Sequence, residues 1–303
     1  MSRTRRALFV IFACMAAVPM SGARAQEAVK VTATFSILGD LVRNVGGDRI
    51  ALTTLVGPNG DAHVYSPSPA DAKALVEARL VIANGLGFEG WITRLVKASG
   101  TKAPIVMASS GIKPRKQANA GHAGHGDVDP HAWQSVANAK IYVANIRDAL
   151  IKADAAGEPA YRANASRYLE RLDQLDREIR EALNKLPAER RKVITTHDAF
   201  GYFADAYSVA FIAPQGVSTE SEASARDVAR IITQVRKQQV PAVFLENVTD
   251  SRLIKRIADE TGARIGGTLY SDALTDDKGP ASTYIGMMRH NVKTLSVALE
   301  PGS

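Results

Sequence analysis

The chain has 303 residues, and its formal net charge is +7. Its basic residues are scattered among acidic ones and form no stripe with aromatic side chains, so the composition does not indicate a nucleic-acid partner. Cys14 is the only cysteine, which leaves no pair for a disulfide and excludes a metal site built on thiolates.

The N-terminus predicts a secretory signal peptide over residues 1–25. Three arginines lie within the first six residues, the run Ala7–Val18 is apolar, and Ala23-Arg24-Ala25 has the small-residue pattern of a cleavage site. The apolar run has 12 residues, whereas a membrane-spanning helix needs about 20. We therefore expect cleavage after Ala25 and no membrane anchor of this kind.

Cleavage would leave 278 residues with a net charge of +3, because four arginines leave with the signal. A mature chain of this length suits two modest domains better than one. Lipid attachment at Cys14 is the alternative, but Phe12 suits a lipidation site poorly and the apolar run before Cys14 would be short. We expect a soluble, monomeric protein in the periplasm.

Short β-branched runs alternate with helical patterns along the mature chain, which is typical of an α/β fold. In the first half, the predicted strands are residues 29–34, 50–56, 80–84 and 105–107. The predicted helices there are residues 37–45, 69–78, 91–98 and 137–154.

Residues 159–186 predict one long amphipathic helix. Its apolar positions recur at steps of three and four and form one stripe, made of Leu172, Leu175, Ile179, Leu183 and Leu186. Acidic residues precede basic ones by four positions on its polar side, which supports a helix. Pro187 follows the last apolar position and ends the pattern.

This long helix divides the chain into an N-terminal α/β lobe (26–158), a linking helix (159–187) and a C-terminal α/β lobe (188–303). At 1.5 Å per residue it would be about 40 Å long. It contains no break where a flexible linker could lie, so we expect limited motion between the lobes. The alternative is an ordinary surface helix of one domain.

The alternation resumes in the second half. The predicted strands are residues 192–195, 210–213, 242–245 and a run within 263–270. The predicted helices are residues 199–207, 225–239, 251–261 and 282–299. No internal repeat is strong enough to be inferred from the sequence, and the fold class is α/β with two Rossmann-like lobes.

Three histidines, His63, His131 and His197, follow strands or lie in loops near helix starts. Asp272 lies at a strand end in the same way. Ligands of open α/β sheets bind at these carboxyl ends. Taken singly, each histidine could be a hydrogen-bonded structural residue, and the aspartate could cap the next turn.

The neighbours of two of these histidines favour a rigid binding loop. Pro67 and Pro69 follow His63 and restrict the backbone there. Pro130 precedes His131, and Trp133 offers an apolar wall beside it.

Several segments resemble the metal-specific family of ABC-transporter solute-binding proteins, which take up Zn²⁺ and Mn²⁺. The resemblance covers essentially the whole mature chain. The segments that carry it are His63-x-Tyr65-x-Pro67-Ser68-Pro69-x-Asp71, Asn84-Gly85-Leu86-Gly87-Phe88-Glu89-x-Trp91, Asp129-Pro130-His131-x-Trp133, Thr196-His197-Asp198-Ala199-Phe200-x-Tyr202, Tyr270-Ser271-Asp272-Ala273-Leu274 and Gly279-Pro280-Ala281-x-Thr283-Tyr284. One departure is Ala62, where many relatives have proline.

The resemblance implies that each lobe supplies two metal ligands and that the metal lies in the cleft between the lobes. By matching motif, His63 and His131 belong to the first lobe, and His197 and Asp272 to the second. The implied partners are a membrane permease with its ATPase, and a periplasmic metallochaperone is a further candidate.

Three imidazoles and one carboxylate suit Zn²⁺, which binds such ligands tetrahedrally. Imidazole favours Zn²⁺ over Mn²⁺, which prefers oxygen. Relatives that favour manganese often have a carboxylate where this chain has His197. If both oxygens of Asp272 bind, Mn²⁺ could be accommodated, so transport of Mn²⁺ or Fe²⁺ is the alternative.

We expect a carrier and not an enzyme. A zinc hydrolase is the rival hypothesis, but it needs an open coordination position for water and a nearby base. The chain contains no His-Glu-x-x-His helix, which is the motif typical of many zinc hydrolases.

Further residues are candidates for supporting roles. Carboxylates that could fix the tautomers of the histidines are Asp129, Asp198 and Glu246. His122 and His125, three residues apart in a small polar stretch, could capture Zn²⁺ weakly, or the stretch could be a plain surface loop. His290 in the last helix is expected to be a surface or packing residue.

Overall fold

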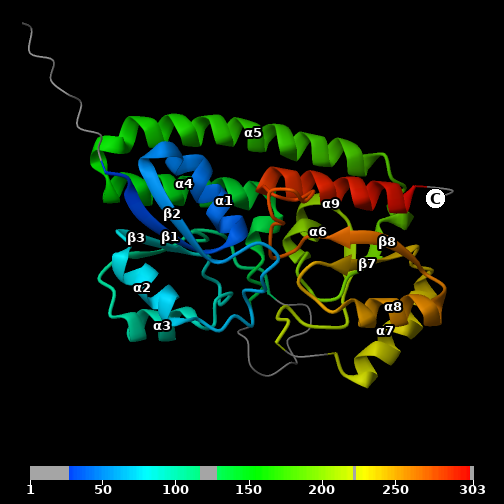
Figure 1. Ribbon diagram of the computed structural model, residues 1–303. Coiled ribbons are helices and arrows are strands. Elements are labelled where there is room, and N and C mark those ends of the chain that lie inside the picture. Colours follow the sequence, from blue (N-terminus) through cyan, green and yellow to red (C-terminus); the bar gives the residue numbers. More distant parts are fainter. Residues whose placement is uncertain (1–26, 117–127, 221–222, 301–303) are drawn as a thin grey trace, which may run out of the picture.

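The fold contains two parallel β-sheets, each of four strands (Figure 1). The computed structural model describes residues 27–116, 128–220 and 223–300. The first sheet has the order β2-β1-β3-β4, with strands Ile50–Val56, Val29–Phe35, Leu80–Ala83 and Ile105–Met107. The second has the order β6-β5-β7-β8, with strands Ala210–Ile212, Lys192–Ile194, Ala242–Glu246 and Arg264–Leu269.

The two sheets share one strand order, and the strand pairings within both are parallel. The sequence did not reveal this internal repeat, because it lies in the backbone topology and not in matching side chains. Parallel strands place all their carboxyl ends at one edge, where ligands of such sheets bind. The two sheets therefore supply two such edges.

Helices connect the strands and cover the sheets. Those of the first half are α1 to α4, with bounds Ser36–Gly46, Pro69–Glu77, Ile92–Ser99 and Val136–Ala153. Those of the second half are α6 to α9, with bounds Gly201–Tyr207, Ala225–Gln238, Ser251–Thr261 and Tyr284–Leu299. The predicted α/β architecture with two lobes is confirmed.

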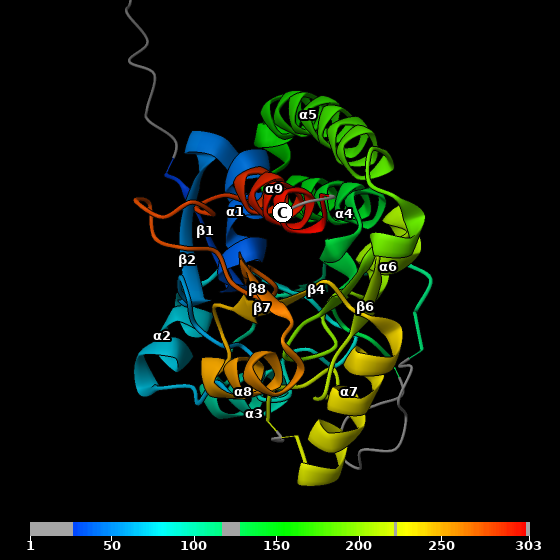
Figure 2. The same cartoon turned by 90° about the vertical axis from the view of Figure 1, so that its right-hand side faces the viewer.

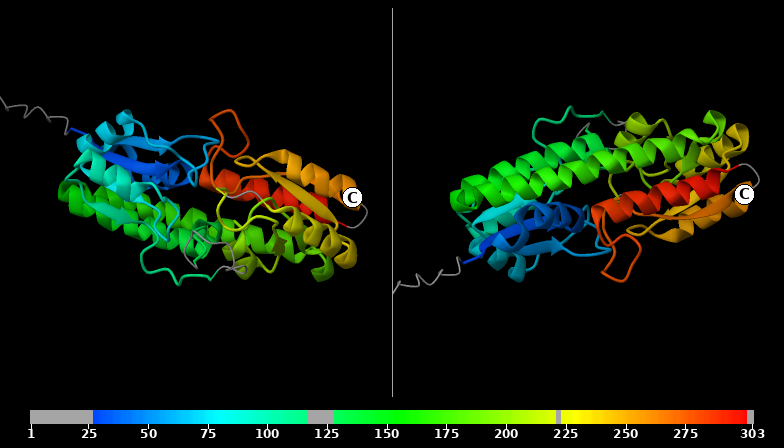
Figure 3. Two further views of the ribbon diagram at one scale, coloured as in Figure 1. Left: turned by 90° about the horizontal axis from the view of Figure 1, so that it is seen from below. Right: turned by 90° about the horizontal axis from the view of Figure 1, so that it is seen from above.

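The long helix α5 (Glu158–Asn184) lies along both lobes, as Figures 1 and 3 show. Pro159 lies in its first turn, where the missing N–H costs nothing. It contacts α1 and α4 of the first half and α6 and α9 of the second, and Figure 2 shows α1, α4 and α9 beside it. The buried side of α5 contains the predicted apolar stripe from Leu172 to Leu183, extended toward its start by Tyr161, Ala165 and Tyr168. The last predicted member, Leu186, is buried but lies beyond the end of the helix.

One hydrophobic core runs through both halves of the molecule. Its buried members include Val31 of the first sheet, Leu172 of α5, and Phe244 and Leu295 of the second half. A smaller cluster lies between the second sheet and the helices α7 and α8. Because the core is continuous across the lobes, a hinge motion between them would expose apolar surface.

Hydrogen bonds also cross between the lobes. The backbone N–H of Tyr284, at the start of α9, donates to the half-buried carboxylate of Asp40 in α1 at 2.9 Å. The hydroxyl of Tyr284 donates to the carbonyl of Trp133 at 2.7 Å. These polar contacts fix the position of α9 against the first lobe.

The structure differs from the sequence-based elements mainly at their ends. The predicted helix at 199–207 begins at Gly201, because His197 to Phe200 form a turn in which the N–H of Ala199 donates to the carbonyl of His197. The signal peptide, Cys14, His122 and His125 lie outside the described residues. Among the described helices, none combines the length and apolar character needed to cross a bilayer.

The packing of α5 generates a prediction about stability. Leu175 is fully buried between the lobes, so Leu175→Ala should lower the free energy of unfolding by about 2–5 kcal/mol through the cavity it leaves. Arg177→Ala on the exposed side of the same helix is the control and should change it by less than about 0.5 kcal/mol. Urea unfolding followed by circular dichroism measures both, and equal losses would contradict the joining role of α5.

Candidate metal centre

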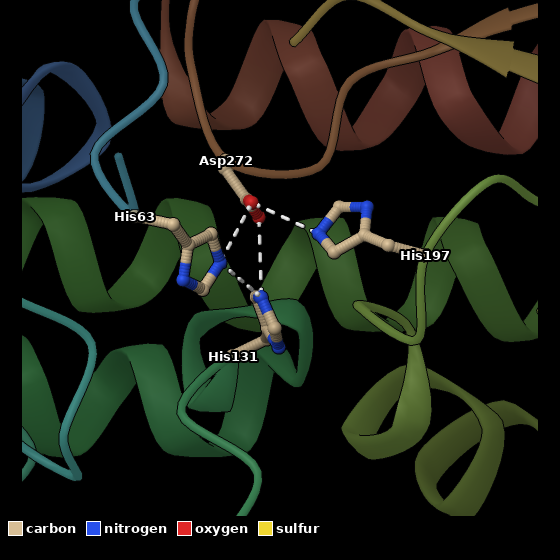
Figure 4. A group of neighbouring side chains, drawn as sticks. All are labelled: His63, His131, His197 and Asp272. Carbon is tan, nitrogen blue, oxygen red and sulfur yellow. Dashed lines mark hydrogen bonds and ion pairs between the residues drawn. The ribbon is translucent and has the colours of Figure 1, made fainter. Parts of the chain in front are cut away.

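Four side chains from distant parts of the chain converge between the lobes: His63, His131, His197 and Asp272 (Figure 4). One ligand atom from each lies within 4.8 Å of all the others. The figure shows the three imidazoles and the carboxylate turned toward one another, from loops of both lobes.

Four of the distances between these atoms are close to the edge of a tetrahedral coordination shell. Nε2 of His63 lies 3.2 Å from Nε2 of His131 and 3.3 Å from Oδ2 of Asp272. Nε2 of His197 lies 3.0 Å from Oδ2 of Asp272, and Nε2 of His131 lies 3.5 Å from Oδ1. Ligand atoms about 2.0–2.1 Å from a tetrahedral Zn²⁺ lie about 3.3 Å from each other.

His63 lies in the loop between β2 and α2, which is held at both ends. Oδ1 of Asp61 accepts the backbone N–H of His63 at 2.9 Å, and the indole of Trp91 donates to the carbonyl of Ala62 at 2.8 Å. A capping box then begins α2, in which Ser68 and Asp71 exchange hydrogen bonds. The loop therefore presents the imidazole with little freedom left.

His131 is oriented by its own neighbour in the sequence. Oδ1 of Asp129 lies 2.8 Å from Nδ1 of His131 and also accepts its backbone N–H. The guanidinium of Arg115 lies 3.4 Å from the other oxygen of Asp129. No sequence motif marks Arg115, because its role depends on a contact that only the folded chain makes. The carboxylate directs Nε2 of His131 toward the centre.

His197 follows β5 and is oriented by the end of the neighbouring strand β7. Oε1 of Glu246 accepts the backbone N–H groups of Thr196 and His197 at 2.7 and 3.0 Å. Oε2 of Glu246 lies 2.8 Å from Nδ1 of His197. One carboxylate thus positions both the backbone and the ring.

Asp272 follows β8 and is held by the first lobe. The indole of Trp133 and the amide of Gln134 both donate to the carbonyl of Ser271, at 2.9 and 2.8 Å. These two donors lie two and three residues after His131 in the chain. The contact therefore brings ligand loops of both lobes into one rigid unit.

Burial and charge compete at these groups. Burial disfavours the charged imidazolium of His131, but the carboxylates beside it outweigh burial and raise its pKa to about 9. The same competition raises the pKa of His197 well above its ordinary value, whereas burial dominates at His63 and lowers its pKa. Burial opposes ionisation of Asp272, but His131 and His197 hold its pKa well below the usual range. Protons and a divalent cation therefore compete for the same nitrogens.

The charges around the centre match a divalent cation. Three buried carboxylates, those of Asp129, Glu246 and Asp272, each contact a histidine of the centre, and Arg115 contacts one of them. With neutral imidazoles, these groups carry two negative charges in excess. A bound dication would neutralise them, which buried charge requires.

A hollow of about 270 Å³ opens beside His63. It is lined by His63, Leu86, Gly87, Val128, Pro130, Val217 and Ser218. The side chain of His63 is 4% exposed, whereas those of the other three are fully buried. A larger hollow of about 490 Å³ lies at the other end of the first sheet, beside Leu80, and its lining has no histidine or carboxylate.

The other predicted residues lie as follows. Asp129 and Glu246 contact ligand rings, but Asp198 lines a separate hollow with Arg115 and Arg230. Nε2 of His290 lies 3.1 Å from the carbonyl of Thr268, away from the four converging residues. His122 and His125 lie outside the described residues.

Known proteins resemble this chain in sequence and in fold. The iron-binding protein YfeA of Yersinia pestis is 34% identical over 267 residues, which is 88% of this chain and 85% of YfeA. The manganese-binding lipoprotein MntA of Bacillus subtilis is 34% identical over 285 residues, which is 92% of each chain. The structure of the periplasmic zinc-binding protein TroA of Treponema pallidum superposes with a TM-score of 0.85 at 31% identity, covering 90% of this chain and all of TroA.

The family described as zinc-uptake complex component A, periplasmic (ZnuA) matches residues 31–298. This match spans both lobes, α5 and all four converging side chains. From its sequence, its fold and these relatives, the chain belongs to the ZnuA family of metal-binding solute-binding proteins of ABC transporters.

Proposed function

We propose that this protein binds Zn²⁺ with high affinity in the periplasm and delivers it to the membrane permease of an ABC transporter, powered by its ATPase. The observation that carries the proposal is the convergence of three imidazoles and one carboxylate, with four of the distances between their ligand atoms at 3.0–3.5 Å. His63, His131, His197 and Asp272 are the proposed ligands.

The chemistry of the ligand set supports zinc as the cargo. Nitrogen ligands favour Zn²⁺ over Mn²⁺, and the third ligand here is His197 and not a carboxylate. The relatives are named for different metals: YfeA for iron, MntA for manganese and TroA for zinc. Transport of Mn²⁺ or Fe²⁺ is accordingly the competing hypothesis, and a direct competition between metals decides it.

The surroundings of the centre support a carrier and not an enzyme. Four protein ligands fill a tetrahedron and leave no position for a reactive water. The adjacent carboxylates of Asp129 and Glu246 are engaged by histidines and by backbone N–H groups, so neither is free to act as a general base.

The proposed location is the periplasm, reached through cleavage after Ala25. Several relatives, including MntA, are named lipoproteins. Lipid attachment at Cys14 is therefore the competing route to the same side of the membrane, and mass spectrometry of the N-terminus of the exported protein distinguishes the two.

Removal of one proposed ligand gives the primary test. His197→Ala should abolish stoichiometric tight binding of Zn²⁺, because only three candidate ligands remain and Oε2 of Glu246 loses the imidazole beside it. His290→Ala is the matched control and should leave affinity unchanged, since this histidine lies in α9 away from the centre. Competition with a chromophoric chelator measures both affinities, and full retention of binding by His197→Ala would contradict the proposed site.

Metal preference provides a second test. The protein should bind Zn²⁺ more tightly than Mn²⁺ by more than about tenfold, as expected for a nitrogen-rich ligand set. Equilibrium competition between the two ions, read by elemental analysis after gel filtration, gives the ratio. If the protein instead binds Mn²⁺ more tightly than Zn²⁺, the cargo is manganese, and the proposed role as a metal carrier still holds.

The contacts of the neighbouring carboxylates generate a third test. Glu246→Gln should weaken Zn²⁺ binding by about 10–100-fold, because its amide would present a donor to Nδ1 of His197, which also needs to donate. Asp198→Asn, in the neighbouring hollow, should change affinity by less than about threefold. Equal effects of the two variants would show that general charge, and not orientation of His197, is what matters.

A further inference from the structure

The segment of the second lobe beside the hollow at His63 is tied down at both ends. Near its start, the N–H of Gln215 donates to the carbonyl of Thr196, and the carbonyl of Gly216 accepts the N–H of Asp198. Near its end, the hydroxyl of Thr219 donates to Oδ2 of Asp61 at 2.6 Å. Residues 215–219 therefore form a strap, the name used for them below, from the second lobe to the first.

The middle of the strap forms part of the wall of the hollow. Val217 and Ser218 are buried and line the hollow opposite Leu86 and Gly87 of the first lobe. His63 is the only one of the four converging side chains that lines this hollow. A metal ion or a competing ligand that reaches the centre by this route meets His63 first.

Asp61 makes two contacts with its two oxygens. Oδ1 accepts the backbone N–H of His63 at 2.9 Å, and Oδ2 accepts the hydroxyl of Thr219. The same side chain therefore holds the loop of a proposed ligand and the strap that lines the hollow beside it. Asn59 makes separate links to Leu274 and Asn247, so the loop stays attached to the second lobe without Thr219.

We propose that Asp61 and Thr219 are positioning residues that hold the strap across the hollow beside His63 and thereby set the rate at which the metal enters and leaves. This inference rests on the proposed function. The continuous core opposes separation of the lobes, so a local displacement of the strap is the smaller change that opens the route. A hydrogen bond to a carboxylate is strong enough to make the closed arrangement dominant.

The rates of metal entry and release distinguish a strap that controls access from a strap that only orients His63. If the Thr219–Asp61 bond holds the route closed with and without metal, its loss raises entry and release together and changes equilibrium affinity little. If the bond only orients His63, its loss raises release alone and weakens affinity by the same factor.

The test compares Thr219→Val, which removes the hydroxyl, with Thr219→Ser, which keeps it. Thr233→Val is the control, since its hydroxyl contacts only the backbone of α7. Stopped-flow transfer of Zn²⁺ from the loaded protein to excess chelator gives the release rate, and loading of the metal-free protein gives the association rate. We expect Thr219→Val to raise both rates by about tenfold and to change affinity by less than about threefold. Thr219→Ser and Thr233→Val should match the wild type.

Asp61→Ala shows whether the two residues act through one contact. In the Asp61→Ala variant, the additional change Thr219→Val should have little further effect on the release rate, because the carboxylate that accepts the Thr219 hydroxyl is already absent. Provided that the wild type binds Zn²⁺, three outcomes would overturn the role of the strap. Thr219→Val could leave both rates unchanged, Thr219→Ser could change them as much as Thr219→Val does, or Thr219→Val could speed release without speeding entry. A wild type that holds no stoichiometric Zn²⁺ would instead overturn the proposed function, and the inference with it.

Discussion

The rest of the structure depends on a buried concentration of negative charge. Asp129, Glu246 and Asp272 are withdrawn from water at the meeting point of the lobes, where an uncompensated carboxylate is costly. The imidazoles turned toward the same point can reduce that cost in two ways. They can be protonated, or they can lose their protons and bind a divalent cation, which supplies two positive charges. The fold keeps these groups together through hydrogen bonds that cross between the lobes.

The helical layer around α5 explains why the centre can be preorganised. Strand edges from two separate sheets meet only if the sheets keep a constant orientation. The continuous core beneath α5 provides that constraint, because any hinge between the lobes would expose apolar side chains. Any motion that accompanies the proposed metal exchange is therefore expected to be local, in segments such as residues 215–219, and not a rotation of one lobe against the other.

Selectivity among metals follows from the ligands and not from the fold. Relatives that share this architecture are named for iron, manganese and zinc. The proposed preference of this chain for Zn²⁺ over Mn²⁺ rests on its nitrogen-rich set of candidate ligands, which includes His197 beside Glu246. These proteins share one family, and we expect their preference among metals to depend on the few side chains at the metal centre.

The sequence by itself determined the two α/β halves, the long helix and the four candidate ligands, because periodicity, prolines and strand-end motifs are local features. It also offered Asp129, Asp198 and Glu246 as candidates for orienting the histidines, without assigning them to particular rings. The tertiary structure alone decided that Glu246 and not Asp198 contacts His197, that Arg115 lies behind Asp129, and that Thr219 reaches Asp61. Apart from Arg115 with Asp129, these contacts join residues about 50 to 160 positions apart, and their partners are set by the register of parallel strands and the packing of the lobes, which no local pattern encodes.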